Sequence, residues 1–332
     1  MSSPSRPAVP RSSDDLLSRS DRGEPHVTVS GAHRVRSDDP RGTLVLIGGA
    51  VSPAGAALAA FLDASSAFDG GRIVGITEAS SDPGESARTW LEDLRLAGAT
   101  NVEFPALRRG DAAHDREIAA MIAEADGIFL GGGDQVKLVD ALSGTAVARA
   151  IRLAHARGAT VCGTSAGAAA LTELTMAGGE IDDEGNLVEQ YIGPGLGLLG
   201  FDAIIDTHFS ERRRLQRLFL VVAEHPRLFG LGIDEDTALV VRGHVGRVVG
   251  AGGVTFVDGR TSMQFDNAGR LDRGRQLTVS YLRVGIVGTH YELDLRMREL
   301  ELLVRQGKLP YAEQVERDEH GNRRGQPVRA ER

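Results

Sequence analysis

The stretch ATVCGTSAG (159–167) decides the fold. Its first half is a short apolar run with β-branched residues, which is typical of a buried parallel strand. Its second half, GTSAG (163–167), matches the G-x-S-x-G pattern, and the small residues after it predict a helix. In such a strand-to-helix turn the serine hydroxyl is lifted out of the sheet, and the flanking glycines avoid collisions with neighbouring backbone. The sequence therefore predicts an α/β sheet with Ser165 as a nucleophile, against the alternative of an ordinary serine-containing turn.

Strand and helix signals alternate on the amino-terminal side of this stretch. We expect strands at 43–50, 72–80, 101–107 and 127–133, and helices from the Ser52-Pro53 pair, over 84–97 and 111–125, from Asp134 and over 145–157. Short connections between alternating elements predict a parallel sheet covered by helices on both faces.

The pattern changes after residue 175. We expect strands at 201–209, 231–241, 247–258 and 277–285, a helix over 210–224 and a last amphipathic helix over 291–305. The spacing of these strands predicts antiparallel pairing at one edge of the sheet. We expect one catalytic domain over 42–306, a disordered leader over 1–41 and a polar, flexible tail over 307–332.

Composition excludes several classes of protein. The chain has 332 residues, a single cysteine and a net charge of −8. One cysteine excludes a disulfide framework and a cysteine-built zinc site, and net acidity argues against a nucleic-acid binder. The chain has no apolar run long enough for a membrane span and no apolar segment typical of a secretory signal, so the expected location is the cytoplasm.

A serine nucleophile needs a base and a group that orients it. Of the nine histidines, His208 stands at the end of an apolar strand, where a parallel sheet presents its active-site edge, although a packed histidine is the alternative. Spacing does not decide which carboxylate orients it. The candidates are Glu173, Glu180, Asp182, Asp206 and Asp234.

Two further segments carry possible chemistry. The loop Gly131-Gly132-Gly133-Asp134-Gln135 ends a strand and opens a helix, so its N–H groups suit an oxyanion, unless it is only a tight turn. The segment 210–217 places Arg214 and Arg217 on one predicted helix face, where they suit carboxylates or simply solvent. The acidic turn 234–236 suits a guanidinium or solvent, and the G-x-G-x-x-G match at 195–200 lies in the wrong context for a dinucleotide.

Five segments in this order resemble the cyanophycinase family, serine peptidases of the superfamily that includes aspartyl dipeptidase. They are FLGGGDQ (129–135), GTSAGA (163–168), PGLGLL (194–199), DTHFSERRRLQRL (206–218) and GIDEDTAL (232–239). The resemblance implies a flavodoxin-like three-layer α/β sandwich, mainly parallel with antiparallel edge strands. It also implies a homodimer and neither metal nor other cofactor.

The resemblance also implies roles for single residues. Ser165 is the nucleophile, His208 the base and Glu180 the acidic member, and the oxyanion donors are the N–H groups of Gly132, Gly133 and Ala166. The substrate pocket is formed by Gln135, Asp206, Thr207, Arg212, Arg214 and Arg217. Thr207 departs from the pattern, which has glutamine before the histidine.

The expected activity is hydrolysis of cyanophycin, a poly-aspartate with arginine on each side-chain carboxyl, to β-aspartyl-arginine through an acyl-enzyme. The alternatives are an aspartyl dipeptidase or another acidic-peptide hydrolase, and a non-catalytic binding protein on the same fold.

Overall fold

The structure, a computed structural model, describes residues 41–108, 111–181, 187–264, 279–289 and 291–302. The chain divides into two compact units, Met1–Val35 and Arg36–Arg332, and every described residue belongs to the second. The predicted tail, and the predicted leader up to residue 40, lie outside the described residues.

The main sheet has nine strands in the order β17-β16-β11-β10-β1-β5-β4-β2-β3. The strands β1 to β5 pair in parallel, and β10, β11, β16 and β17 add antiparallel strands beyond β1, as predicted. The strands are β1 (Leu44–Ile47), β2 (Ile73–Ile76), β3 (Val102–Glu103), β4 (Gly127–Leu130), β5 (Thr160–Thr164), β10 (Thr237–Arg242), β11 (Val245–Gly250), β16 (Tyr291–Asp294) and β17 (Glu299–Leu302).

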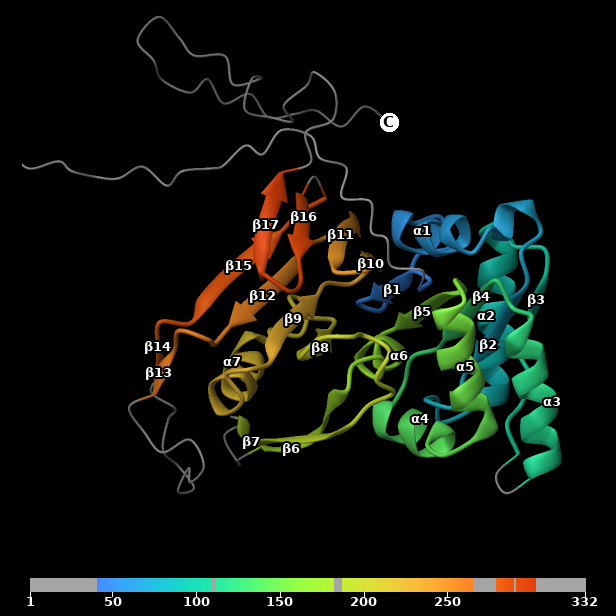
Figure 1. Ribbon diagram of the computed structural model, residues 1–332, viewed down its shortest axis with the longest axis horizontal. Coiled ribbons are helices and arrows are strands. Elements are labelled where there is room, and N and C mark those ends of the chain that lie inside the picture. The colour runs from blue at the N-terminus through green and yellow to red at the C-terminus, as the bar shows by residue number, and fades with distance from the viewer. Residues whose placement is uncertain (1–40, 109–110, 182–186, 265–278, 290, 303–332) are drawn as a thin grey trace, which may run out of the picture. The chain divides into compact units, whose positions relative to one another are not determined.

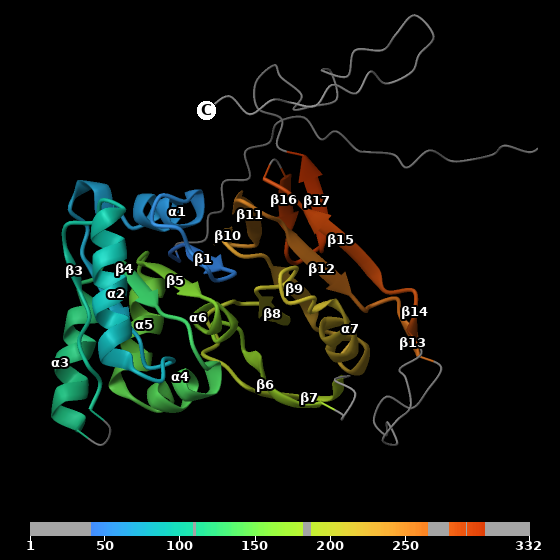
Figure 2. The same ribbon diagram turned by 180° about the vertical axis from the view of Figure 1, so that it is seen from behind.

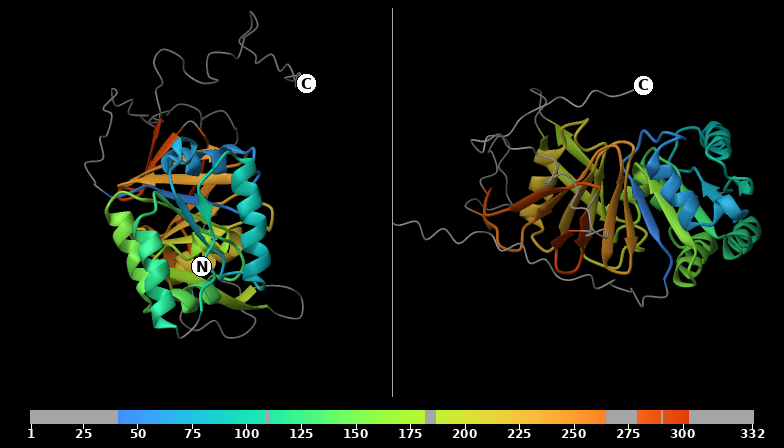
Figure 3. Two further views of the ribbon diagram at one scale, coloured as in Figure 1. Left: turned by 90° about the vertical axis from the view of Figure 1, so that its right-hand side faces the viewer. Right: turned by 90° about the horizontal axis from the view of Figure 1, so that it is seen from above.

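Helices cover both faces of the parallel half, so this part has three layers (Figures 1 and 2). Alternate residues of one strand point to opposite faces, and in β1 Leu46 joins the core under α3, α4 and α5 while Ile47 joins the core under α1 and α2. The left panel of Figure 3 shows helices on the two sides of the sheet. The helices are α1 (Ala56–Ala64), η1 (Ala67–Asp69), α2 (Pro83–Leu96), α3 (Ala112–Ala123), α4 (Gln135–Leu142), α5 (Ala146–Ala156), α6 (Ala166–Ala169) and α7 (Leu215–Glu224).

A second sheet has four strands in the order β15-β12-β9-β8. They are β8 (Ala203–Thr207), β9 (Phe229–Ile233), β12 (Val254–Asp258) and β15 (Arg283–Val287), and α7 packs on one face through Leu218 and Val222. Two ribbons complete the fold: β6 (Leu174–Ile181) with β7 (Leu187–Pro194), and β13 (Met263–Gln264) with β14 (Val279–Ser280).

Three predicted strands were wrong in extent. The expected strand 277–285 includes, over its described residues, β14 and the start of β15, which belong to different sheets. The expected strand 231–241 is β9 and β10, which belong to different sheets and are joined by the turn 234–236. The expected strand 247–258 is likewise divided into β11 and β12 at Ala251–Gly253. In these last two places the chain passes from one sheet to the other, which an unbroken apolar run does not reveal.

Three predicted helices also differ from the structure. The helix expected over 291–305 is the hairpin β16–β17 over its described residues, and the helix expected from Ser210 begins at Leu215. The arginines before Leu215 therefore lie in tight turns, with Arg213 in the left-handed region at φ 52°. The first helix begins at Ala56 instead of at Pro53.

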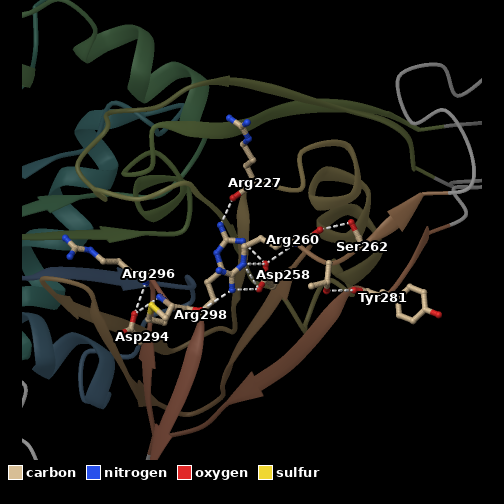
Figure 4. A network of polar contacts seen from close by, with 11 residues as sticks. Arg227, Asp258, Arg260, Ser262, Tyr281, Asp294, Arg296 and Arg298 are labelled. Atoms are coloured by element: carbon tan, nitrogen blue, oxygen red, sulfur yellow. Dashed lines mark hydrogen bonds and ion pairs between the residues drawn. The ribbon is translucent and has the colours of Figure 1, made fainter.

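The hairpin β16–β17 is fastened to the second sheet by a buried ion pair (Figure 4). Arg298, in the hairpin turn, donates to Asp258 at 2.7 Å, and its guanidinium lies 5.0 Å from the centre of the Phe229 ring. Arg260 also donates to Asp258, at 2.8 Å. Burial alone would raise the pKa of the Asp258 carboxyl, but the hydrogen bonds from Arg260 and Arg298 lower it below its ordinary value.

Candidate active site

Ser165 occupies the sharp turn that the sequence predicts between β5 and α6. Its backbone is strained, with φ 51° and ψ −118°. The turn needs glycine on both sides, because a Cβ on Gly163 would lie 2.4 Å from the oxygen of Gly167, and one on Gly167 would lie 2.2 Å from the oxygen of Leu130. The Ser165 N–H donates to the oxygen of Ile47 at 2.9 Å, which anchors the turn to β1.

His208 lies one residue beyond β8, and its imidazole meets the serine. Nε2 is 2.9 Å from Ser165 Oγ, within hydrogen-bond distance. His208 also has a left-handed backbone, at φ 49°, and its N–H donates to the oxygen of Gly48 at 2.8 Å. Gly49 lies directly against the imidazole ring, so that a Cβ there would be 2.2 Å from Cε1.

The carboxylate that contacts the other ring nitrogen belongs to Glu235. Its Oε1 lies 2.6 Å from His208 Nδ1. Because β8 and β9 are parallel neighbours, their carboxyl ends meet at one edge, and the turn after β9 brings Glu235 beside His208. A carboxylate at Nδ1 favours the tautomer in which Nε2 accepts the serine proton.

Among the described side chains this contact is made by Glu235 and not by Glu180, for which the resemblance implies the role, so the role of Glu180 stays a prediction. Glu180 is on β6, paired in register with Glu189 across the ribbon, and its side chain is not described. Of the other candidates, Asp206 pairs with arginines, Asp234 accepts backbone N–H groups, Glu173 is exposed and Asp182 lies outside the described residues. Glu235 was missed because the strand predicted over 231–241 ran through the acidic turn 234–236, whose carboxylates were expected to meet a guanidinium or solvent.

The expected oxyanion donors lie on the serine's side of the sheet edge: Gly132 is close to Ser165, Ala166 follows it in the chain, and Gly133 lines the same cavity. A Cβ on Gly132 would lie 3.7 Å from Ser165 Oγ, and Gly133 has φ 139° and lies so close to the oxygen of Ala79 that no side chain fits. Within the described part of the chain, no hydrogen bond occupies the N–H groups of Gly132, Gly133 or Ala166. These donors are therefore open to an oxygen next to Ser165 Oγ.

A cavity opens beside Ser165. Gln135 and Met176 form one part of its wall, and the amide nitrogen of Gln135 donates to the oxygen of Met176. The remaining wall includes Asp206, Thr207, Arg212, Arg214 and Arg217, so every predicted pocket residue lines one cavity with the nucleophile.

Asp206 holds two of the three arginines. Its buried carboxylate accepts from Arg217 Nε at 2.5 Å and from Arg214 at 3.2 Å. Burial lowers the pKa of Arg214 below its ordinary value although Asp206 opposes this, and the nearby Arg217 and Arg212 lower it further. Arg212 is exposed and has no carboxylate partner among the described residues.

Three further features of the described residues concern metal ions, the cysteine and membranes. No group of three or more histidine, cysteine, aspartate or glutamate side chains is placed to hold a metal ion there. The Cys162 thiol is fully buried in β5, and this burial raises its pKa well above the ordinary value, so the thiolate is disfavoured. No helix in the described part of the chain is long and apolar enough to cross a membrane.

Comparison with known proteins identifies the family. Residues 44–249, more than half of the chain, match Peptidase family S51. The chain belongs to this family. It is a serine-type peptidase, and the S51 match includes the whole Ser165–His208–Glu235 arrangement.

Curated relatives and a solved structure agree with the S51 assignment. The chain is 36% identical to the cyanophycinase of Trichormus variabilis over 215 residues, 64% of this chain and 71% of that protein. It is 33% identical to the cyanophycinase of Synechococcus elongatus over 228 residues, 68% of this chain and 70% of that protein. The crystal structure of a peptidase from an acI-B1 Actinobacterium superposes with a TM-score of 0.53 at 25% identity, covering 66% of this chain and 91% of that one.

Proposed function

We propose that this S51 peptidase is a serine exopeptidase that hydrolyses cyanophycin and releases β-aspartyl-arginine. The observation that carries the proposal is the cavity beside Ser165, which holds three arginines around a single buried aspartate. A cavity with such an excess of positive charge suits a carboxylate, and each cyanophycin unit keeps one, the free carboxylate of the arginine that is bonded to the aspartate side chain. The similarity to cyanophycinases supports this substrate over other acidic peptides.

The residues divide the chemistry of acyl transfer among them. His208 Nε2 takes the proton of Ser165 Oγ as that oxygen attacks the aspartyl carbonyl, and the Glu235 carboxylate stabilises the imidazolium that forms. The carbonyl oxygen becomes an oxyanion within reach of the N–H groups of Gly132, Gly133 and Ala166. His208 then gives the proton to the leaving amine, and water hydrolyses the acyl-enzyme by the same steps.

The arginines of the cavity have two different tasks in this proposal. Arg214 and Arg217 already share the carboxylate of Asp206, whose oxygens also accept from the N–H of Thr207. Asp206 therefore fixes the shape of the site, and Arg212 is the cation most open to a substrate carboxylate. Thr207, with its short side chain, leaves room where the family pattern has a glutamine.

Product analysis with purified cyanophycin tests the proposal. We expect the wild-type protein to release β-aspartyl-arginine and the Ser165→Ala variant to release none above background. No dipeptide from the wild type, or equal release by both proteins, would refute the assignment. Cleavage of Asp-X dipeptides without turnover of cyanophycin would assign the site to an aspartyl dipeptidase instead.

We further propose that the enzyme acts in the cytoplasm as a homodimer. A lone, buried cysteine suits a reducing compartment, and the dimer is implied by the family resemblance. Mass measurement in solution tests the dimer, since a monomer mass at assay concentration contradicts it. Fractionation of cells that produce the protein tests the location.

A further inference from the structure

The backbone of His208 is strained and has to be held in place. A non-glycine residue at φ 49° persists only where its surroundings fix it. The N–H of His208 donates to Gly48, its oxygen accepts from Arg212 at 3.0 Å, and the next residue, Phe209, donates to Ile233 at 3.2 Å. The Phe209 bond continues the pairing of β8 with β9, and the Gly48 bond ties the same turn to the segment after β1.

The next backbone N–H after Phe209, that of Ser210, is bound by a side-chain carboxylate. The N–H of Ser210 donates to Asp234 Oδ1 at 3.1 Å. The second oxygen of the same carboxylate accepts from the N–H of Gly253 at 3.0 Å, just before β12 begins. Asp234 thus joins the turn after His208, the turn after β9 and the start of β12.

The surrounding chain makes room for this carboxylate. A Cβ on Gly252 would lie 2.7 Å from the Cβ of Asp234 and 2.9 Å from its Oδ2. The two accepted N–H groups come from different segments, so both carboxylate oxygens are needed. An asparagine would offer one oxygen and turn an N–H₂ group toward the other donor.

Each acid of the turn 234–236 has its own partner. Glu235 contacts His208 Nδ1, while Asp236 Oδ1 accepts from the N–H of Ser52 at 3.1 Å. Asp234 is the residue directly before Glu235, and its partner Ser210 lies two residues after His208. Asp234 therefore bridges the same two turns that carry the histidine and the glutamate.

We propose that Asp234 is a positioning residue for the peptidase reaction. Its carboxylate fixes the separation of the His208 and Glu235 turns and so keeps the imidazole aligned with Ser165. The proposal rests on the Ser165–His208–Glu235 mechanism and is independent of the substrate. Asp234 acts through His208 and Glu235, not through contact with the reacting atoms.

The rate at which a fluorophosphonate labels Ser165 tests this role without cyanophycin. The variants are Asp234→Ala and Asp234→Asn, with Asp126→Ala as the matched control. Asp126 also accepts a backbone N–H, that of Arg72 at 2.8 Å, but it lies at the opposite ends of the parallel strands. Thermal unfolding of all variants shows whether each is folded.

We expect Asp234→Ala to label about 10- to 100-fold more slowly than the wild type, because a displacement near 1 Å costs about that much. Asp234→Asn should regain part of the loss, and Asp126→Ala should stay within about twofold of the wild type while losing some thermal stability. In the folded Asp234→Ala protein, the proton NMR signal of the Nδ1–H···Glu235 bond should move or vanish. With cyanophycin, kcat should fall far more than KM changes.

Labelling of Asp234→Ala within about twofold of the wild type, with the proton signal unchanged, would overturn the proposal. Equal losses in Asp234→Ala and Asp126→Ala would also overturn it, since they would indicate general destabilisation. If the Ala variant does not fold, the comparison of Asp234→Asn with Asp126→Asn decides in the same way. Failure of the labelled wild type to cleave cyanophycin would refute only the proposed substrate.

Discussion

Replacement of Gly49 by alanine tests how closely the imidazole is packed. Gly49 has φ 99°, and a Cβ there would lie 2.2 Å from His208 Cε1 and 2.4 Å from Nε2. Ordinary contacts begin at 3.4 Å, so the ring has to move by about 1 Å. Movement away from Gly49 disturbs the 2.9 Å contact between Nε2 and Ser165 Oγ.

The size of the effect follows from this displacement. A misplacement of about 1 Å costs about 100-fold in rate, which corresponds to about 2.7 kcal/mol of barrier. The arginines that line the cavity come from other segments, so substrate binding is largely retained. We therefore expect kcat to fall about 100-fold while KM changes by less than about threefold.

Steady-state kinetics on cyanophycin and fluorophosphonate labelling both measure this loss. The control is Gly70→Ala, because Gly70 has a similar φ of 89° and no atom within 4 Å of its Cβ position. Both variants carry the cost of an alanine at positive φ, and only Gly49→Ala carries the collision. If kcat of Gly49→Ala stays within about threefold of the Gly70→Ala value, the tight packing of the imidazole is refuted.

Three further predictions concern the acid that orients His208, the substrate pocket, and the ion pair between Asp258 and Arg298. Glu235→Gln should lower kcat by about 10²- to 10⁴-fold, whereas Glu180→Gln should not; the opposite ranking in a cyanophycin assay would restore Glu180. Arg212→Ala should raise KM for cyanophycin about tenfold with little change in kcat, and an unchanged KM would exclude Arg212 from substrate binding. Because the pKa of Asp258 is lowered in the folded state, its contribution to stability is present above about pH 4 and is lost as the pH falls further. Asp258→Asn should therefore lower Tm by about 5 °C at pH 7 and by less near pH 3, and equal losses at both pH values would contradict the role of the ion pair with Arg298.

The parallel half of the sheet was predictable because its signals are local. Each buried strand is a short apolar run that ends in glycine or a polar turn, and each following helix has its own cap and periodicity. Asp134, for example, is the N-cap of α4, and its side chain accepts a hydrogen bond from the N–H of Val136, as N-cap aspartates commonly do. Ser165 and the sharp turn that carries it were predictable for the same reason, since strand, turn and helix are contiguous in the chain.

The orienting acid was not predictable in this way, because it depends on which strands are neighbours. The apolar residues before and after the turn 234–236 fit one continuous strand equally well. Only the parallel pairing of β8 with β9 shows that Glu235 meets His208. The pattern offers one usable signal: three adjacent acids interrupt an apolar run, and a buried strand rarely tolerates that.

The helix prediction for 291–305 was wrong for a different reason. Its apolar residues fit a helical face, but Leu293 and Leu295 are buried while Glu292 and Asp294, which alternate with them, are only half-buried. That alternation is the period of a strand. The deciding factor is Arg298, whose left-handed backbone closes the hairpin and whose guanidinium reaches Asp258 in the second sheet.

Residues with a strained backbone conformation lie where the segments of the active site meet. Ser165, His208 and Asp236 are non-glycine residues with a positive φ, of 51°, 49° and 46°. Each such residue costs of order 1–3 kcal/mol, so bonds from several segments have to hold them together. The Gly48-Gly49 pair supplies part of this, since Gly48 accepts from His208 and Gly49 accepts from the N–H of Asp236. Glycines such as Gly48 and Gly49 can be read from the sequence, whereas the strained backbone that they help to hold cannot. The geometry of the active site depends on both.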